Sequence, residues 1–187
     1  MDEPEQTYGI VLAAGAGTRY GGPKALARTP DGRPWLHAAV EALRGGGCDE
    51  VIVVLGAGAD AAVSLVPTGA RAVVATDWAA GLSHSLRAGL GAAAGADAAI
   101  FVPVDTPEIP ASAVSRVRAA ASALTTALVR AEYHGRPGHP VLVGAAHFER
   151  LARESTGDVG AGPFLSRHGV TGVECADLWA GNDIDRP

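Results

Sequence analysis

Short runs of apolar and β-branched residues alternate with stretches of helical periodicity along most of the chain. The segment EVIVVLG, residues 50–56, is a continuous apolar run of the kind that forms a strand covered on both faces. Further strands are predicted at residues 8–12, 70–76 and 98–105, with helices between them at 35–43, 59–66 and 81–95. This alternation predicts an α/β fold with a mainly parallel central sheet.

The remaining third of the chain continues the same pattern with more strands. A helix is predicted from Pro110 to Ala121, strands at 124–133 and 139–144, a helix at 145–155 and a last strand at 170–178. No internal repeat, low-complexity tract or linker interrupts the 187 residues, which are enough to bury a hydrophobic core. We therefore expect a single domain over residues 1–187.

Composition excludes several classes of protein. Hydrophobic residues make up 48% of the chain and charged residues 19%, which is typical of a folded domain. The net charge of −5 argues against a nucleic-acid partner. The apolar segments are too short for a membrane span and the N-terminus lacks an apolar run, so a cytoplasmic protein is expected. Cys48 and Cys175 show no ligand spacing and are expected to be buried small hydrophobes.

The glycine-rich stretch VLAAGAGTRYGGPKAL follows the first predicted strand. A dinucleotide-binding fingerprint requires a third glycine where this chain has Tyr20. A P-loop requires Lys directly after its last glycine and then Ser or Thr, but here Pro23 precedes Lys24 and Ala25 follows it. Neither motif is present in full.

The loop nevertheless has the chemistry of a phosphate site. Small residues from Ala13 to Gly17 leave backbone N–H groups accessible to phosphate oxygens. Arg19 and Lys24 add two cations, so the pattern favours a triphosphate. The residues alone are also compatible with an ordinary strand-to-helix turn that carries solvated basic side chains.

The stretch LAAGAGTRYGGPKAL resembles the signature L-A-A-G-x-x-x-R-[MF]-G-x-x-K of the sugar-phosphate and molybdopterin nucleotidyltransferases. The resemblance implies a three-layer, Rossmann-like nucleotidyltransferase fold. It also implies that Arg19 and Lys24 neutralise phosphate charge during catalysis. The nucleotide would then be held by Leu12, Ala13, Ala14, Gly15 and Gly17, together with Lys24.

A second segment, DWAAGLSHSLRAGL, is similar to the family pattern W-x-x-G-M-x-x-S-L, which lies near the nucleobase and ribose. The resemblance implies nucleotide-binding roles for Asp77, Gly81 and Ser85. Taken without the resemblance, the segment reads as an amphipathic helix with a serine at its N-cap.

Two acidic segments are similar to the family's metal-binding elements. Asp105 in FVPVDTPEIP follows an apolar strand and matches a D-x-P element whose Asp binds magnesium. NDIDRP resembles the C-terminal D-[IV]-D-T-P-E-D, which implies Asp185 as a second ligand of Mg²⁺, with Asp183 as the neighbouring alternative. From the residues alone, Asp105 is equally suited to capping a turn and Asp183 to a solvent-facing role.

The segment HGRPGHPVLVG looks like the G-x-x-G-H-P-[VA]-L-[IF] run of the molybdenum cofactor cytidylyltransferases. It implies that Arg136, Gly138 and His139 contact the second substrate, although the prolines and glycine also suit a simple turn. TGDVGAGPFL resembles that subfamily's G-D-x-G-A-R-x-L-L, but Gly162 stands where those relatives have Arg. This difference puts the usual molybdopterin substrate in question.

The resemblance implies an Mg²⁺-dependent enzyme that moves a nucleoside monophosphate from a nucleoside triphosphate to a phosphorylated small-molecule acceptor. Ala14 favours CTP over GTP, and molybdopterin cofactor is the favoured acceptor, with a molybdoenzyme as a further partner. Two alternatives remain open. One is an NAD(P)H-dependent enzyme like nicotine blue oxidoreductase, and the other is a non-catalytic module that binds a nucleotide or cofactor.

Overall fold

A computed structural model describes residues 4–186, in which seven strands form one sheet. The sheet order is β3-β2-β1-β4-β6-β5-β7. Strand β6 is antiparallel to both of its neighbours, whereas every other pairing is parallel. The strands are β1 (Thr7–Ala13), β2 (Glu50–Leu55), β3 (Arg71–Val74), β4 (Ala98–Pro103), β5 (Leu128–Tyr133), β6 (Arg136–Gly144) and β7 (Thr171–Glu174).

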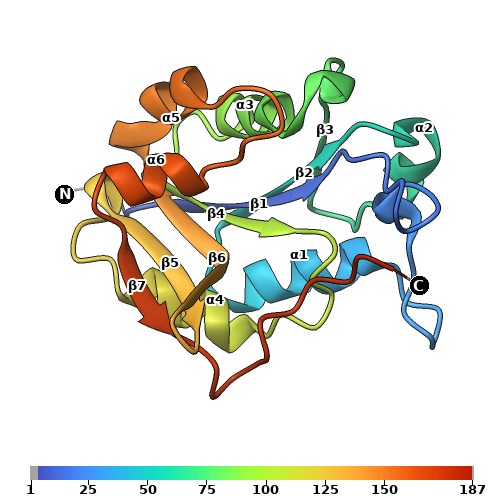
Figure 1. Cartoon of the computed structure of the whole chain (residues 1–187). Coiled ribbons are helices and arrows are strands. Elements are labelled where there is room, and N and C mark those ends of the chain that lie inside the picture. Colours follow the sequence, from blue (N-terminus) through green and yellow to red (C-terminus); the bar gives the residue numbers. More distant parts are fainter. Residues whose placement is uncertain (1–3, 187) are drawn as a thin grey trace.

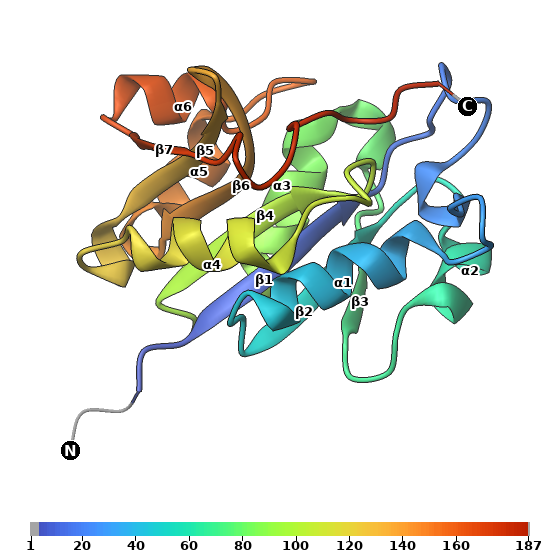
Figure 2. The same ribbon diagram turned by 90° about the horizontal axis from the view of Figure 1, so that it is seen from below.

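Helices cover both faces of the sheet, so the molecule has three layers (Figure 1). Helices α1 and α4 lie on one face, in front of the sheet in Figure 2, and α3, α5 and α6 lie on the other. The α/β fold with a mainly parallel sheet is thus confirmed. The helices are α1 (Trp35–Gly45), α2 (Ala59–Ala62), α3 (Leu82–Ala92), α4 (Ala111–Ala119), α5 (Phe148–Glu154) and α6 (Gly162–Arg167).

Small residues allow the layers to approach closely. Helix α1 begins after Pro34, buries Leu36 and Leu43, and ends at the glycines that follow Arg44. A Cβ at Gly9 of β1 would lie 2.8 Å from Leu43 Cδ1, so only glycine admits the helix at this spacing. Both cysteines are free and buried, as the sequence predicts.

The structure departs from the predicted elements in three places. Residues 124–126 form a 3₁₀ helix, η4 (Leu124–Thr126), and the strand begins only at Leu128. The predicted helix at 59–66 is the short α2 followed by a 3₁₀ helix, η2 (Val63–Leu65). Helix α6 was not predicted, because its 6 residues are too few to show a helical period and begin with Gly-Pro.

Strand β1 lies between β2 and β4, where the order of strands along the chain reverses direction. In open α/β sheets this switch point opens a crevice beyond the carboxyl ends of the strands. The glycine-rich loop leaves β1 at that edge, and Asp105 follows β4 at the same edge. Among the described residues, none of the helices has the length and apolar character needed to cross a lipid bilayer.

Candidate nucleotidyl-transfer site

The loop after β1 is shaped by Gly17. This residue has a φ of +61°, and its carbonyl accepts the N–H groups of Tyr20, Gly21 and Gly22 at 3.0, 2.9 and 3.1 Å. A Cβ at position 17 would lie 1.9 Å from the carbonyl oxygen of Gly22. Position 17 therefore requires glycine for two independent reasons, the left-handed backbone and the close approach.

The same loop presents a row of unpaired donors. Within residues 4–186, the backbone N–H groups of residues 15–19 donate to no acceptor. Residues 12–20 line a cavity of about 640 Å³ between this loop and the start of α3. Successive free N–H groups at the wall of a cavity form an anion-binding nest, which is suited to phosphate oxygens.

Lys24, the only lysine in the sequence, lies at the side of this cavity. Its Nζ donates to Asp105 Oδ2 at 2.8 Å and to Asp185 Oδ1 at 3.0 Å, and Arg19 Nη1 lies 3.1 Å from Asp185 Oδ2. Burial lowers the pKa of Lys24, but the hydrogen bonds with the two carboxylates outweigh it and the pKa is raised. The hydrogen bond from Lys24 has the opposite effect on its partner Asp185, whose pKa it lowers. Both groups are therefore charged at neutral pH.

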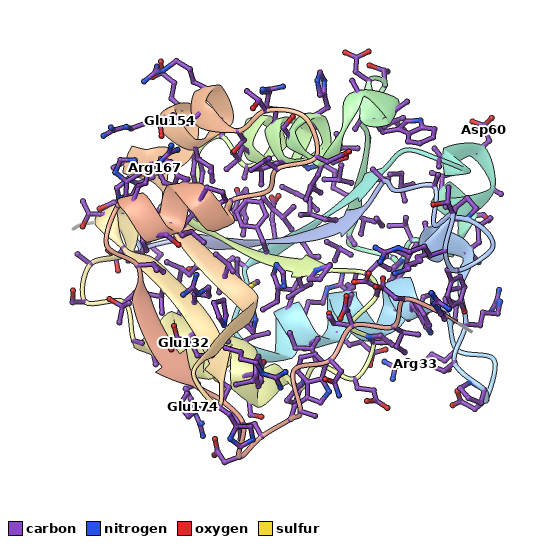
Figure 3. The ribbon with its side chains drawn as sticks, viewed as in Figure 1. Arg33, Asp60, Glu132, Glu154, Arg167 and Glu174 are labelled. Atoms are coloured by element: carbon purple, nitrogen blue, oxygen red, sulfur yellow. The ribbon has the colours of Figure 1, made fainter. Side chains whose placement is uncertain are left out.

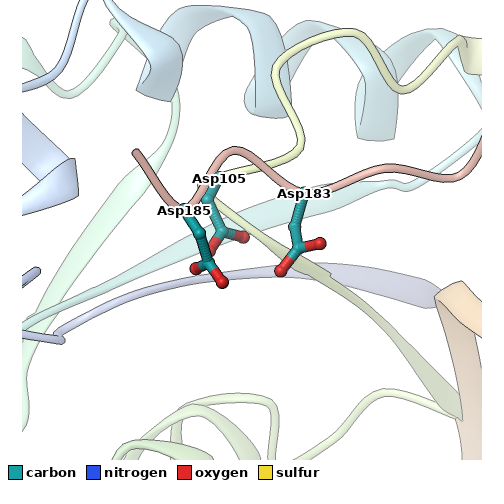
Figure 4. Close-up of side chains that lie close together, drawn as sticks. All are labelled: Asp105, Asp183 and Asp185. Carbon is teal, nitrogen blue, oxygen red and sulfur yellow. The ribbon is translucent and has the colours of Figure 1, made fainter. Parts of the chain in front are cut away.

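Three carboxylates meet beside Lys24. One oxygen each of Asp105, Asp183 and Asp185 lies within 4.8 Å of the others (Figure 4). Asp105 lies just after β4, whereas the other two belong to the C-terminal segment. A 2.9 Å hydrogen bond from Ile184 N to the backbone carbonyl of Asp105 fixes that segment here. The structure thus brings together both aspartates proposed as metal ligands and the neighbouring alternative.

A second cavity of about 470 Å³ adjoins the first and shares Asp105, His139 and Asp183 with it. Its remaining walls are mainly apolar and come from α3, β4, β5, β6, α6 and the segment after β7. Helix α6 is held to α5 by an ion pair between Arg167 Nη2 and Glu154 Oε2 at 2.9 Å (Figure 3). Two cavities that share an acidic wall could hold two substrates with their reacting groups at the carboxylates.

The predicted second-substrate residues are only partly together. Gly138 and His139 line the second cavity, and Tyr133 Oη donates to the carbonyl of His139 at 2.6 Å. Burial lowers the pKa of His139, although the nearby carboxylates of Asp105 and Asp183 oppose this. Arg136 is exposed at the start of β6 and lines neither cavity.

Of the residues predicted near the nucleobase, Gly81 and Ser85 line the first cavity and Asp77 does not. Asp77 is exposed and precedes a 3₁₀ helix, η3 (Trp78–Ala80). Helix α3 has Gly81 at its N-cap and no side-chain cap, so the serine cap considered from the sequence is not formed.

Replacing Gly81 by alanine should destabilise the protein and weaken nucleotide binding. Gly81 has a φ of +121°, and a Cβ there would lie 2.4 Å from the backbone of Gly157, whose carbonyl accepts the N–H of Ser83. We expect a loss of about 1–3 kcal/mol from backbone strain alone, measured as a lower Tm. Gly91→Ala in the same helix is the control, because a Cβ there meets open space. Equal Tm values for the two variants would contradict the prediction.

Sequence reasoning missed two polar residues of the second cavity, Arg130 and Trp179. Arg130 interrupts the otherwise apolar start of β5, and a cation within a buried strand is a signal that could have found it. Trp179 is one of three tryptophans in a chain with few aromatic residues. Gly162, noted above for the absence of an arginine, lines this cavity too.

Comparison with known proteins agrees with this geometry. The model of the MobA-like NTP transferase domain matches residues 9–172, which include the nest, Lys24, Asp105 and His139. The chain belongs to the MobA-like NTP transferase family. Members of this family use a nucleoside triphosphate and a small-molecule acceptor. The match begins within β1 and ends within β7, before the C-terminal segment that carries Asp183 and Asp185.

Individual relatives cover nearly the whole chain. Nicotine blue oxidoreductase of Paenarthrobacter nicotinovorans is 36% identical over 193 residues, covering 95% of this chain and 91% of its own. Rv0371c of Mycobacterium tuberculosis H37Rv superposes with a TM-score of 0.82 at 28% identity over 97% of this chain and 94% of that one. A structure of Rv0371c in complex with manganese has a TM-score of 0.74 at 29% identity and covers 91% and 88%.

Proposed function

We propose that this protein is a divalent-metal-dependent nucleotidyltransferase that transfers CMP from CTP to a phosphorylated small molecule. Molybdopterin cofactor is the favoured acceptor. The observation that carries the proposal is the junction of the two cavities, where free backbone N–H groups, the single lysine and three carboxylates meet. This arrangement combines the parts that phosphoryl chemistry requires, namely donors for phosphate oxygens, a mobile cation and hard oxygen ligands.

The residues divide the reaction between them. The N–H groups of residues 15–19 would hold the triphosphate in the first cavity, and Arg19 and Lys24 would offset the charge of the departing pyrophosphate. An oxygen of the acceptor phosphate attacks the α-phosphorus, and the bond to the β-phosphate breaks with its electron pair leaving on pyrophosphate. Catalysis consists of orienting the two phosphates and stabilising charge, because no covalent intermediate with the protein is needed.

The three carboxylates fit a divalent cation. Their oxygens lie within 4.8 Å of one another, and Mg²⁺ and Mn²⁺ prefer such hard ligands. A bound cation would polarise the phosphate oxygens. The manganese complex of the relative Rv0371c supports the proposal that the present protein also binds a divalent metal. Lys24 presently contacts two of the three aspartates, so it must release at least one of them for all three to coordinate a cation.

The second cavity would hold the acceptor. It shares Asp105 and Asp183 with the nucleotide cavity, so an acceptor phosphate bound there would lie beside the same carboxylates. His139 lines both cavities, and its lowered pKa keeps its ring neutral at neutral pH, so it would act there as a hydrogen-bonding group. We assign the cytidine preference to Ala14, which is 3% exposed at the base of the nucleotide cavity.

A second candidate function comes from the relative that is 36% identical. The name of that relative, nicotine blue oxidoreductase, favours a reductase that uses a nicotinamide nucleotide. The glycine loop lacks the third glycine of the usual dinucleotide fingerprint, as Tyr20 occupies that position. The three clustered carboxylates also have no role in hydride transfer, so we rank this function second.

Ligand-dependent stabilisation separates the two functions. We expect CTP with Mg²⁺ to raise the Tm by several degrees, and GTP, ATP and NADPH to raise it less. With molybdopterin cofactor added, α-labelled CTP should transfer its label to the acceptor and release one pyrophosphate per label transferred. Stabilisation by NADPH alone, with no effect of CTP and Mg²⁺, would overturn the transferase proposal in favour of the reductase.

A further inference from the structure

Unpaired hydrogen-bond donors are concentrated at the wall of the second cavity. Within residues 4–186, five buried side-chain polar atoms lack a partner, and two of them belong to residues that line this cavity. These two are Arg130 Nε and Trp179 Nε1. Buried donors are rarely left unpaired, because their desolvation is then not compensated. Both atoms are covered in this structure, so a molecule in the cavity would supply their acceptors after the two side chains rotate toward it.

Arg130 has donors to spare. It projects to the same side of β5 as Leu128, which belongs to the core beneath α3, α5 and α6, and its side chain is 13% exposed. A guanidinium group carries five N–H donors. Within the described residues Arg130 makes one side-chain hydrogen bond, from Nη2 to Glu132 Oε1 at 3.1 Å. Most of its donors are therefore available to a ligand after a small rotation of the side chain.

Trp179 also lines the cavity, and its side chain is positioned by packing, while its backbone N–H donates to Cys175 O at 3.3 Å. Its ring meets Tyr133 edge-on, with centroids 5.4 Å apart and planes at 86°. Tyr133 is itself fixed by its hydrogen bond to the carbonyl of His139. The indole ring is thus positioned by its apolar surface, and its buried N–H has no partner among the described residues.

The rest of the wall restricts what that ligand can be. Apolar side chains of Leu82, Leu86, Phe101, Val141 and Leu165 line the cavity. Glu132, which Figure 3 shows on β5, already offsets the charge of Arg130 and does not line the cavity. A second phosphate group would bring two negative charges to a pair that is already neutral. A carbonyl oxygen on an apolar ring instead matches the spare donors without added charge, and an enolate adds one negative charge where a phosphate adds two.

We propose that Arg130 and Trp179 determine acceptor specificity by binding a ring oxygen, a carbonyl or enolate, at the end of the acceptor far from its reacting phosphate. This inference rests on the proposed function, because it takes the second cavity as the acceptor site. It assigns recognition to residues in β5 and in the segment after β7, and it excludes the exposed Arg136.

Fragment binding tests the inference without the full acceptor. We would measure dissociation constants by ligand-observed NMR for 2-quinolone, for quinoline, which lacks the oxygen, and for phenyl phosphate. The wild-type protein should bind 2-quinolone most tightly. Arg130→Met should weaken 2-quinolone about tenfold, and Trp179→Phe should weaken it about fivefold while keeping the ring packing. Quinoline binding should not change in either variant.

Three controls make the outcome decisive. Arg153→Met removes an exposed arginine of α5 and should leave 2-quinolone binding unchanged. Arg130→Lys keeps the charge and serves as the second variant if Arg130→Met fails to fold. CTP binding, measured on every variant, should stay the same, and its absence from the wild-type protein would count against the proposed function alone. The inference is overturned if no fragment binds, if phenyl phosphate binds best, or if Arg136→Met weakens 2-quinolone and Arg130→Met does not.

Discussion

Lys24→Met should lower the rate of CTP-dependent pyrophosphate release about a thousandfold and, in the absence of nucleotide, strengthen Mn²⁺ binding about tenfold. The two effects have opposite directions because the ammonium group has two partners. Its Nζ lies 2.8 Å from Asp105 and 3.0 Å from Asp185, so it would compete with a metal ion for the same two carboxylates. In the proposed reaction it would instead stabilise the charge of the leaving pyrophosphate.

Mn²⁺ affinity is measured by electron paramagnetic resonance of the free ion, and turnover by a coupled pyrophosphate assay. Arg28→Met is the matched control, since Arg28 is an exposed cation of the same region, and within residues 4–186 its side chain donates only to Gly32 O. Because Lys24 is the only lysine, amine labelling of its side chain also reports whether metal or CTP releases it. Weaker Mn²⁺ binding in Lys24→Met would show that the ammonium group supports the acidic cluster rather than competing with a metal.

Asp105→Asn should abolish Mn²⁺ binding and reduce turnover more than a thousandfold, on the order of the largest losses seen for charge-stabilising groups. Asn is isosteric with Asp, so the hydrogen bond from Ile184 N to the carbonyl of residue 105 is retained. Asp105 is the less exposed of the two carboxylates that contact Lys24, because 20% of its side chain is exposed against 40% for Asp185. Its charge is therefore the least screened by water.

The three aspartates form an ordered series. We expect Asp185→Asn to lose less activity than Asp105→Asn, and the exposed Asp183→Asn to lose least. Asp177→Asn is the control, as Asp177 is exposed and pairs with Arg116 away from both cavities. Full activity in Asp105→Asn, or a larger loss in Asp183→Asn, would refute the proposed metal site.

Much of the fold could be predicted from the sequence because the signals for strands and for helix ends are both local. Continuous apolar runs such as 50–55 marked buried parallel strands, and Pro34 and the glycines after Arg44 marked the ends of α1. The reversal of β6 could not be predicted, because strand direction depends on connections rather than on composition. The prediction of a strand at residues 124–126 was wrong. Two carbonyl oxygens of this segment lie only 2.4 Å from where a Cβ of Gly144 would be, and no local pattern encodes such a long-range contact.

The site was less predictable from residues alone. The nest at 15–19 and the cations beside it lie in one short stretch, so their proximity follows from the spacing. The contact of Lys24 with Asp185 joins positions 161 apart, and the family resemblance pointed to each residue but not to their pairing. Arg130 and Trp179 act, in our proposal, through a cavity between distant elements, which is why no motif revealed them.

The acidic cluster also has a consequence for how the protein folds. Its ligands come from the end of β4 and from a segment that follows β7, so they meet only after the intervening strands have joined the sheet. Closing a long loop costs entropy before the contacts between such distant positions can stabilise the fold. If the cluster binds a metal ion as we propose, metal affinity would arise only with the completed native state, and the ion would capture that state instead of templating it.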